Sequence, residues 1–575
     1  MIMGLSPIQI PRIRRYFKVQ QPQKQAEIVN FKSHLESLPQ HLILEIGRQS
    51  HFLRDVLSLS LCSSRLRSAL ASILYSTIEL RSNRLFKATL VGLTRHPEIP
   101  QHIKKLVVRP NSAEWTLPGD EIDESIVSNL LVSVVPLCRR LEAFVWDGWE
   151  MPDDRLWLVL RTSCPSLKSV STTVGVQPLN PSSHFFEFSD LRQFSLTVKC
   201  RSLEWLLDGH PKTEKLPRKF WEMLLERCPN LEELTIASIA PSPRMFDIRH
   251  VTAGRWRRLR SLTLGDLVVN PNEAEKCRLP DQHPLMKFFA AHRKLQHVAL
   301  QQAGRSESFP PCFSLVPAAL PDLESFSGSL RYVKTLPHPE RLKHLNLTSL
   351  HHTPSVLTPT FSVLRGLPSL ISLSIWIDIS FGGRTNYFQD ESHIFSSLLA
   401  FCPNLRHLEV LCFTHPTFRV REFSRALQNS PQLESFVLTK MYKSREEDIT
   451  MIAERVIYEN PNLKKFTLRY TADRWPTQAA GRLRQLGIYE VRCDEDGNPS
   501  GLFAYEWGLR AFGFEHSRSF VHPLSMDKTP RSPGSPETKS TRSSFSSGKS
   551  AGRASFSSER SRTSFDLGFN LYGLV

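Results

Sequence analysis

A six-residue pattern, apolar-x-x-apolar-x-apolar, recurs from about residue 100 to about residue 490 and constrains the fold more than any other feature. Its last four positions alternate, so in a short strand the second and third apolar residues point to one side and the residues beside them to the other. One strand cannot bury such a face alone, whereas strands stacked as a parallel sheet can. The clear copies begin at Leu231, Leu259, Leu342, Leu370, Leu405, Leu433 and Leu463, and the weaker ones at Ile103, Leu141, Leu167, Leu191, Leu295, Leu323 and Leu483.

The segments before many of these strands are expected to be helical. Residues 220–230, 394–404 and 452–462 carry apolar residues with helical spacing and end in a proline-containing turn. The spacing of successive copies resembles that of leucine-rich repeats, although irregular intervals indicate loop insertions. We therefore predict an α/β fold in which residues 81–510 form a curved leucine-rich-repeat solenoid with parallel strands. An ordinary α/β domain would give only one or two chance matches to the pattern.

Residues 33–80 differ from the repeats because they are dense in leucine and lack the strand pattern. Ser37 is expected to cap a helix whose first turn accepts Pro39. Two further helices are expected around residues 55–62 and 65–74. The segment is therefore predicted to be a compact helical module.

The module reads, in order, Leu38-Pro39, Leu42, Ile46, Asp55-x-Leu57-x-Leu59-x-Leu61-Cys62, Leu66 and Leu74-Tyr75-x-x-Ile78. This order resembles the F-box, particularly as it occurs in fungal F-box proteins with degenerate leucine-rich repeats. The F-box usually has Glu two positions after its Leu-Pro, where this chain has His41. The resemblance implies binding to the adaptor subunit of a cullin-based ubiquitin ligase. The residues expected to contact the adaptor, or to hold the helices that do, are Leu38, Pro39, Leu42, Ile46, Leu57 and Leu59.

The resemblance implies a substrate-recognition subunit of an SCF-type ligase, whose partners are the adaptor, through it a cullin, and an unknown protein substrate. The alternative is that residues 33–80 only cap the first repeat and that the chain is a scaffold with no role in ubiquitin transfer. A Gly-rich phosphate loop, a Gly-x-Ser-x-Gly elbow and a His-Glu-x-x-His helix are all absent from the sequence. We therefore expect a non-catalytic protein without a cofactor.

The outward residues of the strands are the candidates for target binding, because solenoids recognise partners on their concave face. Most are small, and Trp376 stands out among the larger ones because Trp and Arg dominate binding energy in many interfaces. The alternative is that each is only a solvent-facing strand residue. His297, His344 and His407 share one repeat position, but nothing near them in sequence completes a metal site, and none is predicted. The candidates are Arg109, Asp147, His344, Trp376, His407, Lys465 and Arg469.

The net charge of +17 lies mainly on the ends of the chain. Residues 1–32 carry six Lys/Arg against one acidic residue, and residues 518–575 carry nine against four, so +10 lies outside the body. Nucleic-acid binding is therefore not expected. Residues 1–32 are predicted to be a flexible basic extension; a mitochondrial presequence is the alternative, but Pro7 and Pro11 interrupt the helix that it needs.

The apolar runs are too short for a membrane span, and no membrane association is expected. Ten cysteines are scattered without a pairing interval, and Cys62, Cys164, Cys228 and Cys402 occupy similar contexts. We interpret them as small buried apolar residues in a reducing compartment, the cytoplasm and/or the nucleus.

Residues 511–575 are rich in Ser, Pro, Lys and Arg and are predicted to be a disordered tail. Three Ser/Thr-Pro sites and a threefold Arg-x-Ser-Phe sequence resemble sites of proline-directed and basic-directed kinases. Phosphates there would offset the positive charge of the tail. The candidate sites are Thr529, Ser532, Ser535, Ser544, Ser555 and Ser564.

Overall fold

The computed structural model describes residues 34–50, 53–81, 83–111, 121–199, 212–238, 244–265, 284–301, 319–352, 354–377, 392–412, 420–441, 448–471, 483–493, 499–509 and 515–523. The chain divides into two compact units, Met1–Leu74 and Tyr75–Val575, and each has its own hydrophobic core.

The first unit is helical. It contains α1 (His34–Ser37), α2 (Gln40–Gln49), α3 (Leu53–Cys62) and α4 (Ser64–Leu74). Its core consists of Ile43, Val56, Leu66, Ala69 and Leu70, which come from three of the helices. Gly47 allows α2 to pack closely on α4, because a Cβ atom there would lie 2.6 Å from a methyl carbon of Leu70.

Two details of the predicted module are wrong. Ser37 does not cap the helix that follows; it ends α1, and the N-cap of α2 is Pro39, which provides no side-chain hydrogen bond. The module was also expected to extend to residue 80, but residues 77–80 form β1 (Thr77–Leu80), the first strand of the sheet in the second unit. The backbone of β1 pairs in parallel with the next strand, so this segment belongs to the solenoid.

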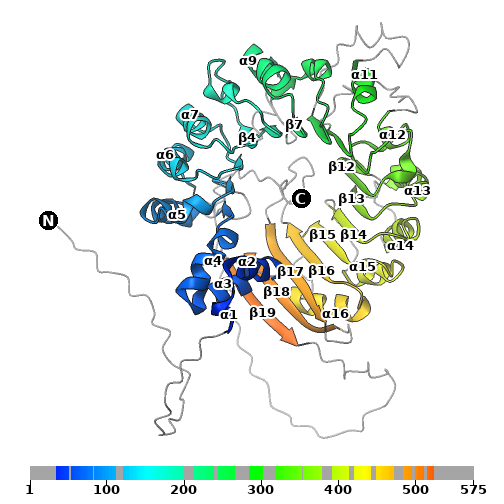
Figure 1. Cartoon of the computed structure of the whole chain (residues 1–575). Helices are drawn as coiled ribbons and strands as arrows, with labels where there is room; N and C mark the ends of the chain where they lie inside the picture. Colours follow the sequence, from blue (N-terminus) through cyan, green and yellow to red (C-terminus); the bar gives the residue numbers. More distant parts are fainter. Residues whose placement is uncertain are drawn as a thin grey trace, which may run out of the picture. The chain divides into compact units, whose positions relative to one another are not determined.

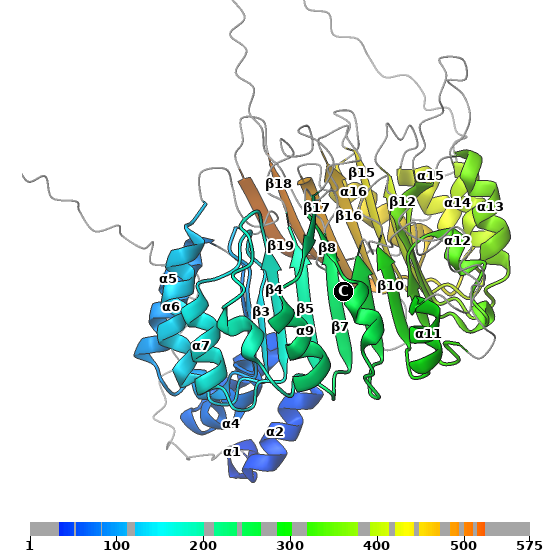
Figure 2. The ribbon, with the colours of Figure 1, turned by 90° about the horizontal axis from the view of Figure 1, so that it is seen from above.

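The second unit is a solenoid; in its described residues seventeen strands form one sheet and two more strands form a separate small sheet. Within this unit the strands line the inner side of a curve and the helices lie on the outer side (Figure 1), and Figure 2 shows the strands side by side. The parallel strands after β1 are β2 (Lys105–Val108), β3 (Ala143–Trp146), β4 (Ser169–Val174), β5 (Gln193–Val198), β7 (Glu233–Ser238), β9 (Ser261–Gly265), β10 (His297–Gln301), β11 (Ser325–Ser327), β12 (His344–His352), β13 (Ser372–Ile377), β14 (His407–Cys412), β15 (Ser435–Met441) and β16 (Lys465–Thr471).

The helices on the outer side alternate with these strands along the chain. The α-helices are α5 (Asn83–Arg95), α6 (Glu124–Val134), α7 (Asp154–Ser163), α9 (Arg218–Glu222), α11 (Pro284–Ala291), α12 (Leu330–Val333), α13 (Pro354–Arg365), α14 (Ser392–Ala400), α15 (Val420–Leu427) and α16 (Ile449–Glu459). Some repeats use a short 3₁₀ turn, namely η1 (Pro100–His102), η2 (Val135–Leu137), η3 (His184–Glu187), η5 (Arg249–Ala253) and η7 (Pro339–Arg341). A π-helical turn, η4 (Met223–Arg227), continues α9, and β6 (Lys212–Lys215) pairs with β8 (Arg244–Asp247) in the smaller sheet. The helices predicted in residues 220–230, 394–404 and 452–462 are thus present.

The repeat pattern positions the strands as predicted. In the copy that begins at Leu231, that residue, Leu234 and Ile236 are all buried, whereas Glu233 and Thr235 face the other side. The buried apolar residues of successive copies form one continuous core along the unit. Since no single repeat can bury this face, the stability of each depends on its neighbours.

A recurring turn before each strand ties it to the previous repeat. The backbone N–H of Leu405, the first apolar residue of its copy, donates to the carbonyl of Cys402 at 3.2 Å. The N–H groups of Arg406 and His407 then both donate to the carbonyl of Ile371, at 2.8 and 3.0 Å. Equivalent bonds occur in most repeats, so they fix the register before the strand ladder begins.

Three of the four cysteines singled out in the sequence lie in this turn. Cys164, Cys228 and Cys402 are buried, and burial raises the pKa of the Cys164 and Cys402 thiols to about 12. The pKa of Cys228 is also raised by burial. Cys62 is the exception, because it lies at the end of α3 and is exposed.

The C-terminal end of the sheet departs from the prediction in two ways. The copy beginning at Leu483 is a strand, β17 (Leu483–Cys493), but it runs antiparallel to β16, so the parallel repeats end at β16. β18 (Pro499–Leu509) and β19 (Glu515–Pro523) continue the sheet in antiparallel fashion. Residues 515–523 are therefore strand and not part of a disordered tail.

Candidate functional site

The helices of the first unit present two exposed apolar stripes. Leu42 and Ile46 are one turn apart on α2, and Leu53, Leu57 and Leu61 follow one another at four-residue intervals on α3. These five side chains are between 40% and 65% exposed. Exposed large apolar residues that gather on one helix face typically mark a protein–protein contact.

The six predicted adaptor-binding residues fall into two groups. Pro39, Leu42, Ile46 and Leu57 are exposed on the surface of the unit. Leu38 and Leu59 are partly buried and pack against the core, so their place is to hold the helices together. The carbonyl of Leu38 also accepts a hydrogen bond from Arg65 Nη2 at 2.9 Å.

Leu53 and Leu61 were missed by the sequence prediction. They belong to the same stripe as Leu57, and the four-residue spacing along α3 is the signal that identifies them. With these two residues included, α3 contributes more exposed apolar side chains than α2.

A chain of alternating charges crosses the first strands of the solenoid. Glu79 of β1 pairs with Arg109 at 3.0 Å, Arg109 approaches Asp147 at 3.7 Å, and Asp147 forms an ion pair with Lys199. Arg109 follows β2, Asp147 follows β3 and Lys199 follows β5, so four strands contribute to the chain. The side chains are all less than about a quarter exposed.

This chain changes the interpretation of two target-binding candidates. Arg109 and Asp147 lie beside each other, as the repeat register predicts, but each is already engaged with an opposite charge. Glu79 and Lys199 were not predicted. They lie 30 and 52 residues from their partners Arg109 and Asp147, and only the alignment of the strands brings each pair together. The four residues pair with one another and so stabilise the inner face, and their charges are less available to a partner protein.

Trp376 is not the exposed anchor that the sequence suggested. Its side chain is only 5% exposed and packs against Leu411, its neighbour in register on β14. The contact lies apart from the main core, on the outward side of the strands. Arg469 occupies the same register row on β16, three strands beyond Trp376, and is half-buried.

His344, His407 and Lys465 lie together in one register row at the beginning of their strands, and all three are exposed. His407 Nδ1 lies 2.8 Å from the hydroxyl of Ser435, and Lys465 pairs with Glu490 at 3.6 Å. These three candidates are therefore brought together on one accessible surface.

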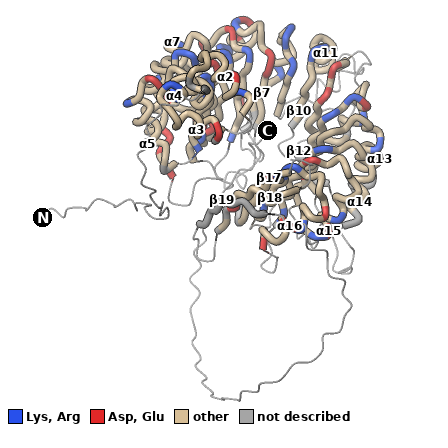
Figure 3. Tube along the Cα trace, turned by 60° about the horizontal axis from the view of Figure 1, so that its bottom comes forward, with Lys and Arg blue, Asp and Glu red and all other residues tan. Residues whose placement is uncertain are grey.

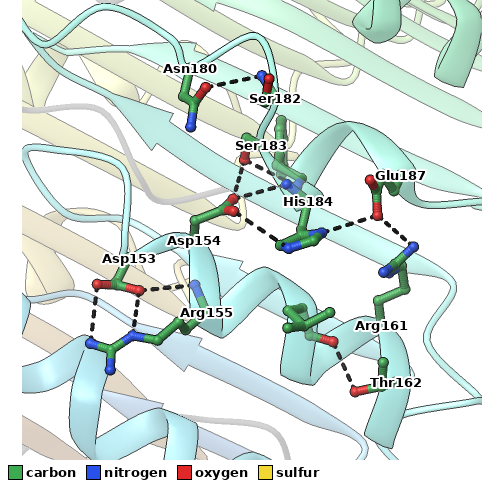
Figure 4. Close-up of polar contacts among 12 residues, drawn as sticks. Asp153, Asp154, Arg155, Arg161, Thr162, Asn180, Ser182, Ser183, His184 and Glu187 are labelled. Atoms are coloured by element: carbon green, nitrogen blue, oxygen red, sulfur yellow. Dashed lines mark hydrogen bonds and ion pairs between the residues drawn. The ribbon is translucent and has the colours of Figure 1, made fainter.

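A polar cluster on the outer side of the solenoid resembles a catalytic set in composition but not in geometry. Asp154 of α7 accepts hydrogen bonds from the Ser183 hydroxyl and the His184 backbone, whereas His184 Nδ1 lies 3.1 Å from Glu187 (Figure 4). The Ser183 hydroxyl donates its hydrogen bond to the Asp154 carboxylate. The His184 imidazole is therefore not placed to take the hydroxyl proton. The cluster joins α7 to η3, and Arg161 completes it through Glu187 at 2.6 Å.

Among the described residues, no group of three or more His, Cys, Asp or Glu side chains converges as a metal ion requires. None of the described helices combines the length and apolar character needed to span a bilayer.

Basic and acidic residues are interspersed along the described trace (Figure 3). The kinase-site candidates Thr529, Ser532, Ser535, Ser544, Ser555 and Ser564 lie outside the described residues.

Comparison with known proteins gives a distant structural similarity. No family model matches the chain, and no curated protein matches its sequence. Among solved structures, the chain is similar to the crystal structure of the Rad7 and Elc1 complex in yeast. The TM-score is 0.33 and the sequence identity 13%, over 70% of this chain and 88% of that chain. A similarity of this size carries no argument about partners or activity.

Proposed function

We infer that the chain is the substrate-recognition subunit of a cullin-based ubiquitin ligase. The first helical unit would bind the adaptor, and the inner face of the solenoid would bind a target protein. The chain would supply no reacting group itself, because ubiquitin transfer would depend on proximity to an enzyme carried by the other subunits. The F-box resemblance suggests the adaptor, and the exposed stripes of α2 and α3 are the observation that carries the proposal.

The stripes favour adaptor binding over an inert helical cap for a physical reason. A helical module without a partner is expected to bury its large apolar residues, as Ile43, Val56 and Leu70 are buried in its core. Leu42, Ile46 and Leu57 have no such contact and remain at least 40% exposed. Burying each in an interface would stabilise a complex by about 1–2 kcal/mol.

The experiment is a binding measurement between the purified full chain and the purified adaptor. A variant with Leu42→Ser, Ile46→Ser and Leu57→Ser should lose binding by at least about 100-fold, because the lost burial energies combine. A control, Leu85→Ser with Ile126→Ser, changes apolar residues on α5 and α6 that are even more exposed and should bind as the wild type does. Circular dichroism melting of all three proteins reports whether each is folded.

A folded wild-type chain that does not bind the adaptor would remove the receptor function. The chain would then be a repeat scaffold, which is the second candidate function. Equal losses in the triple variant and in the control would show nonspecific adhesion through exposed apolar residues, and this outcome also contradicts the proposal.

A further inference from the structure

Seven neighbouring strands, β10 to β16, present one row of polar side chains on the inner face of the sheet. The strand registers place these residues directly beside one another. Histidine and serine alternate along the row, and a lysine ends it. In strand order the row consists of His297, Ser325, His344, Ser372, His407, Ser435 and Lys465.

The side chains of the row point away from the core. The residue that follows each histidine, Val298, Leu345 or Leu408, is buried in the core, so by strand alternation the histidine points to the opposite face. The three histidines are exposed, and the serines between them are half-buried. The row thus offers imidazole N–H and hydroxyl groups, which are hydrogen-bond donors for an acidic ligand.

The spacing of the histidines matches an extended peptide. Neighbouring strands are about 4.8 Å apart, so histidines on every second strand are about 9.6 Å apart. A peptide in the extended polyproline II conformation has three residues per turn and rises about 3.1 Å per residue, so every third side chain lies on the same side, about 9.3 Å from the previous one. A peptide lying along the row, across the strands, would therefore bring every third side chain to a histidine.

Most charged groups around the row are paired with an opposite charge. The nearest carboxylates are engaged: Glu324 pairs with Lys343 at 2.8 Å, and Glu434 pairs with Lys464 at 2.9 Å. Other charged groups near the row in the described residues include Arg406, which approaches Glu434 at 3.7 Å, Glu409, which accepts a hydrogen bond from Ser374, and Glu490, which pairs with Lys465. Since these carboxylates already have partners, a positive charge on the imidazoles would make the row attract anions.

We propose that this row binds an extended peptide carrying Asp or Glu at every third residue, and that binding strengthens as the pH falls below neutrality. The proposal rests on the receptor function above and names the class of target segment. Carboxylates suit the row better than phosphates do, because phosphate sites typically rely on arginine forks and the row itself contains no arginine. One carboxylate for each imidazole gives a matched pair of single charges.

The surroundings of His344 agree with binding that strengthens as the pH falls. Burial and the neighbouring His297 and His407 lower its pKa and so favour the neutral imidazole in the free protein. A carboxylate placed beside it would favour the protonated form and raise its pKa. Binding and protonation are therefore linked, and each should promote the other.

The test uses the full chain and short fluorescein-labelled peptides, with anisotropy measured at pH 7.5, 6.5 and 5.5. The first peptide has Glu at every third position among Ser and Gly. A second has the same composition with Glu at every second position, and a third has phosphoserine in place of Glu. We expect the first to bind tightest and its affinity to rise by about tenfold from pH 7.5 to 5.5.

Variants assign the binding to the row. His297→Gln, His344→Gln and His407→Gln together should abolish the pH dependence and weaken binding at pH 5.5 by about tenfold. A control with His96→Gln, His250→Gln and His338→Gln changes three histidines outside the row and should bind as the wild type does. Melting temperatures of both variants confirm folding.

Three outcomes would overturn the proposal. They are equal binding of the two Glu spacings, unchanged binding by the row variant, and a clear preference for the phosphoserine peptide. Adaptor binding is measured separately and does not involve the row. Loss of adaptor binding with intact peptide binding would therefore remove the ligase function alone, and the converse would remove only this target class.

Discussion

The imidazole of His292 accepts a hydrogen bond from the backbone N–H of Trp256 through its Nε2 atom, at 3.1 Å. Its Nδ1 atom lies 2.8 Å from the carbonyl of Phe288 and therefore carries the proton. The residue is buried in the turn before β10, in the position that cysteine occupies in other repeats. The neutral ring thus joins two repeats, and a proton on Nε2 would face the N–H of Trp256.

This geometry predicts acid sensitivity. Burial lowers the pKa of His292 below its ordinary value of 6.5, so the unfolded chain binds the proton more readily than the folded chain. Its contribution to stability is fully present above pH 6.5 and is lost as the pH falls below it. The melting temperature should therefore drop more between pH 7.5 and 5.5 in the wild type than in His292→Gln, whereas His96→Gln, an exposed control, should follow the wild type.

The contact of Gly47 with Leu70 and Ile73 predicts a strong effect of one added methyl group. In Gly47→Ala, the new Cβ would lie 2.6 and 2.8 Å from methyl carbons of those residues, so either these buried side chains or the helices that carry them must shift. We expect a loss of about 1–3 kcal/mol. The matched change Gly92→Ala on α5 meets no atom within 4 Å and should stabilise by about 0.5–1 kcal/mol.

Hydrogen exchange resolved by segment would measure both changes. Amides of residues 40–74 should exchange faster in Gly47→Ala, and amides of residues 83–95 should exchange more slowly in Gly92→Ala. Unchanged protection of residues 40–74 in Gly47→Ala would contradict the packing of α2 on α4.

The strands could be predicted from the sequence because their signal is local. The pattern beginning at Leu405 or Leu463 specifies which side chains are buried, and burial follows from alternation alone. The direction of β17 could not be predicted in this way, since Leu483 begins a pattern like the others. The connection explains the difference: eleven residues separate Thr471 from Leu483, and a parallel crossover needs a dozen or more.

The candidate site was predictable to a smaller extent. Outward positions such as Arg109 and Trp376 follow from the pattern, but their surroundings depend on strands far away in the sequence. Arg109 is engaged by Glu79 of the preceding repeat, and Trp376 is covered despite its outward position. Of the three exposed leucines on α3, only Leu57 was predicted. It was identified through a resemblance and not through the helical spacing that also marks Leu53 and Leu61.

The charge chain predicts that Asp147 contributes to stability. Asp147→Asn removes the charge that faces both Arg109 and Lys199 and leaves those two cations close to one another. Because the side chains are largely shielded from solvent, we expect a loss of about 1–3 kcal/mol in urea unfolding. The exposed pair Arg218 and Glu222 is the control, since Arg218→Ala should cost less than about 0.5 kcal/mol. Equal effects of the two substitutions would show that the inner chain is only a surface pair.

The cysteines of the repeat turn should be unreactive in the folded protein. Burial raises the pKa of Cys138, Cys164 and Cys402 to about 12, so almost no thiolate forms at pH 8, and reagents cannot reach the sulfur atoms. Cys62 and Cys493 are exposed. Brief treatment with iodoacetamide at pH 8 followed by mass spectrometry should therefore modify Cys62 and Cys493 and spare Cys138, Cys164 and Cys402 until denaturant is added. Fast labelling of Cys164 or Cys402 in native protein would mean that the turn opens, and the stacking of repeats through it would then need revision.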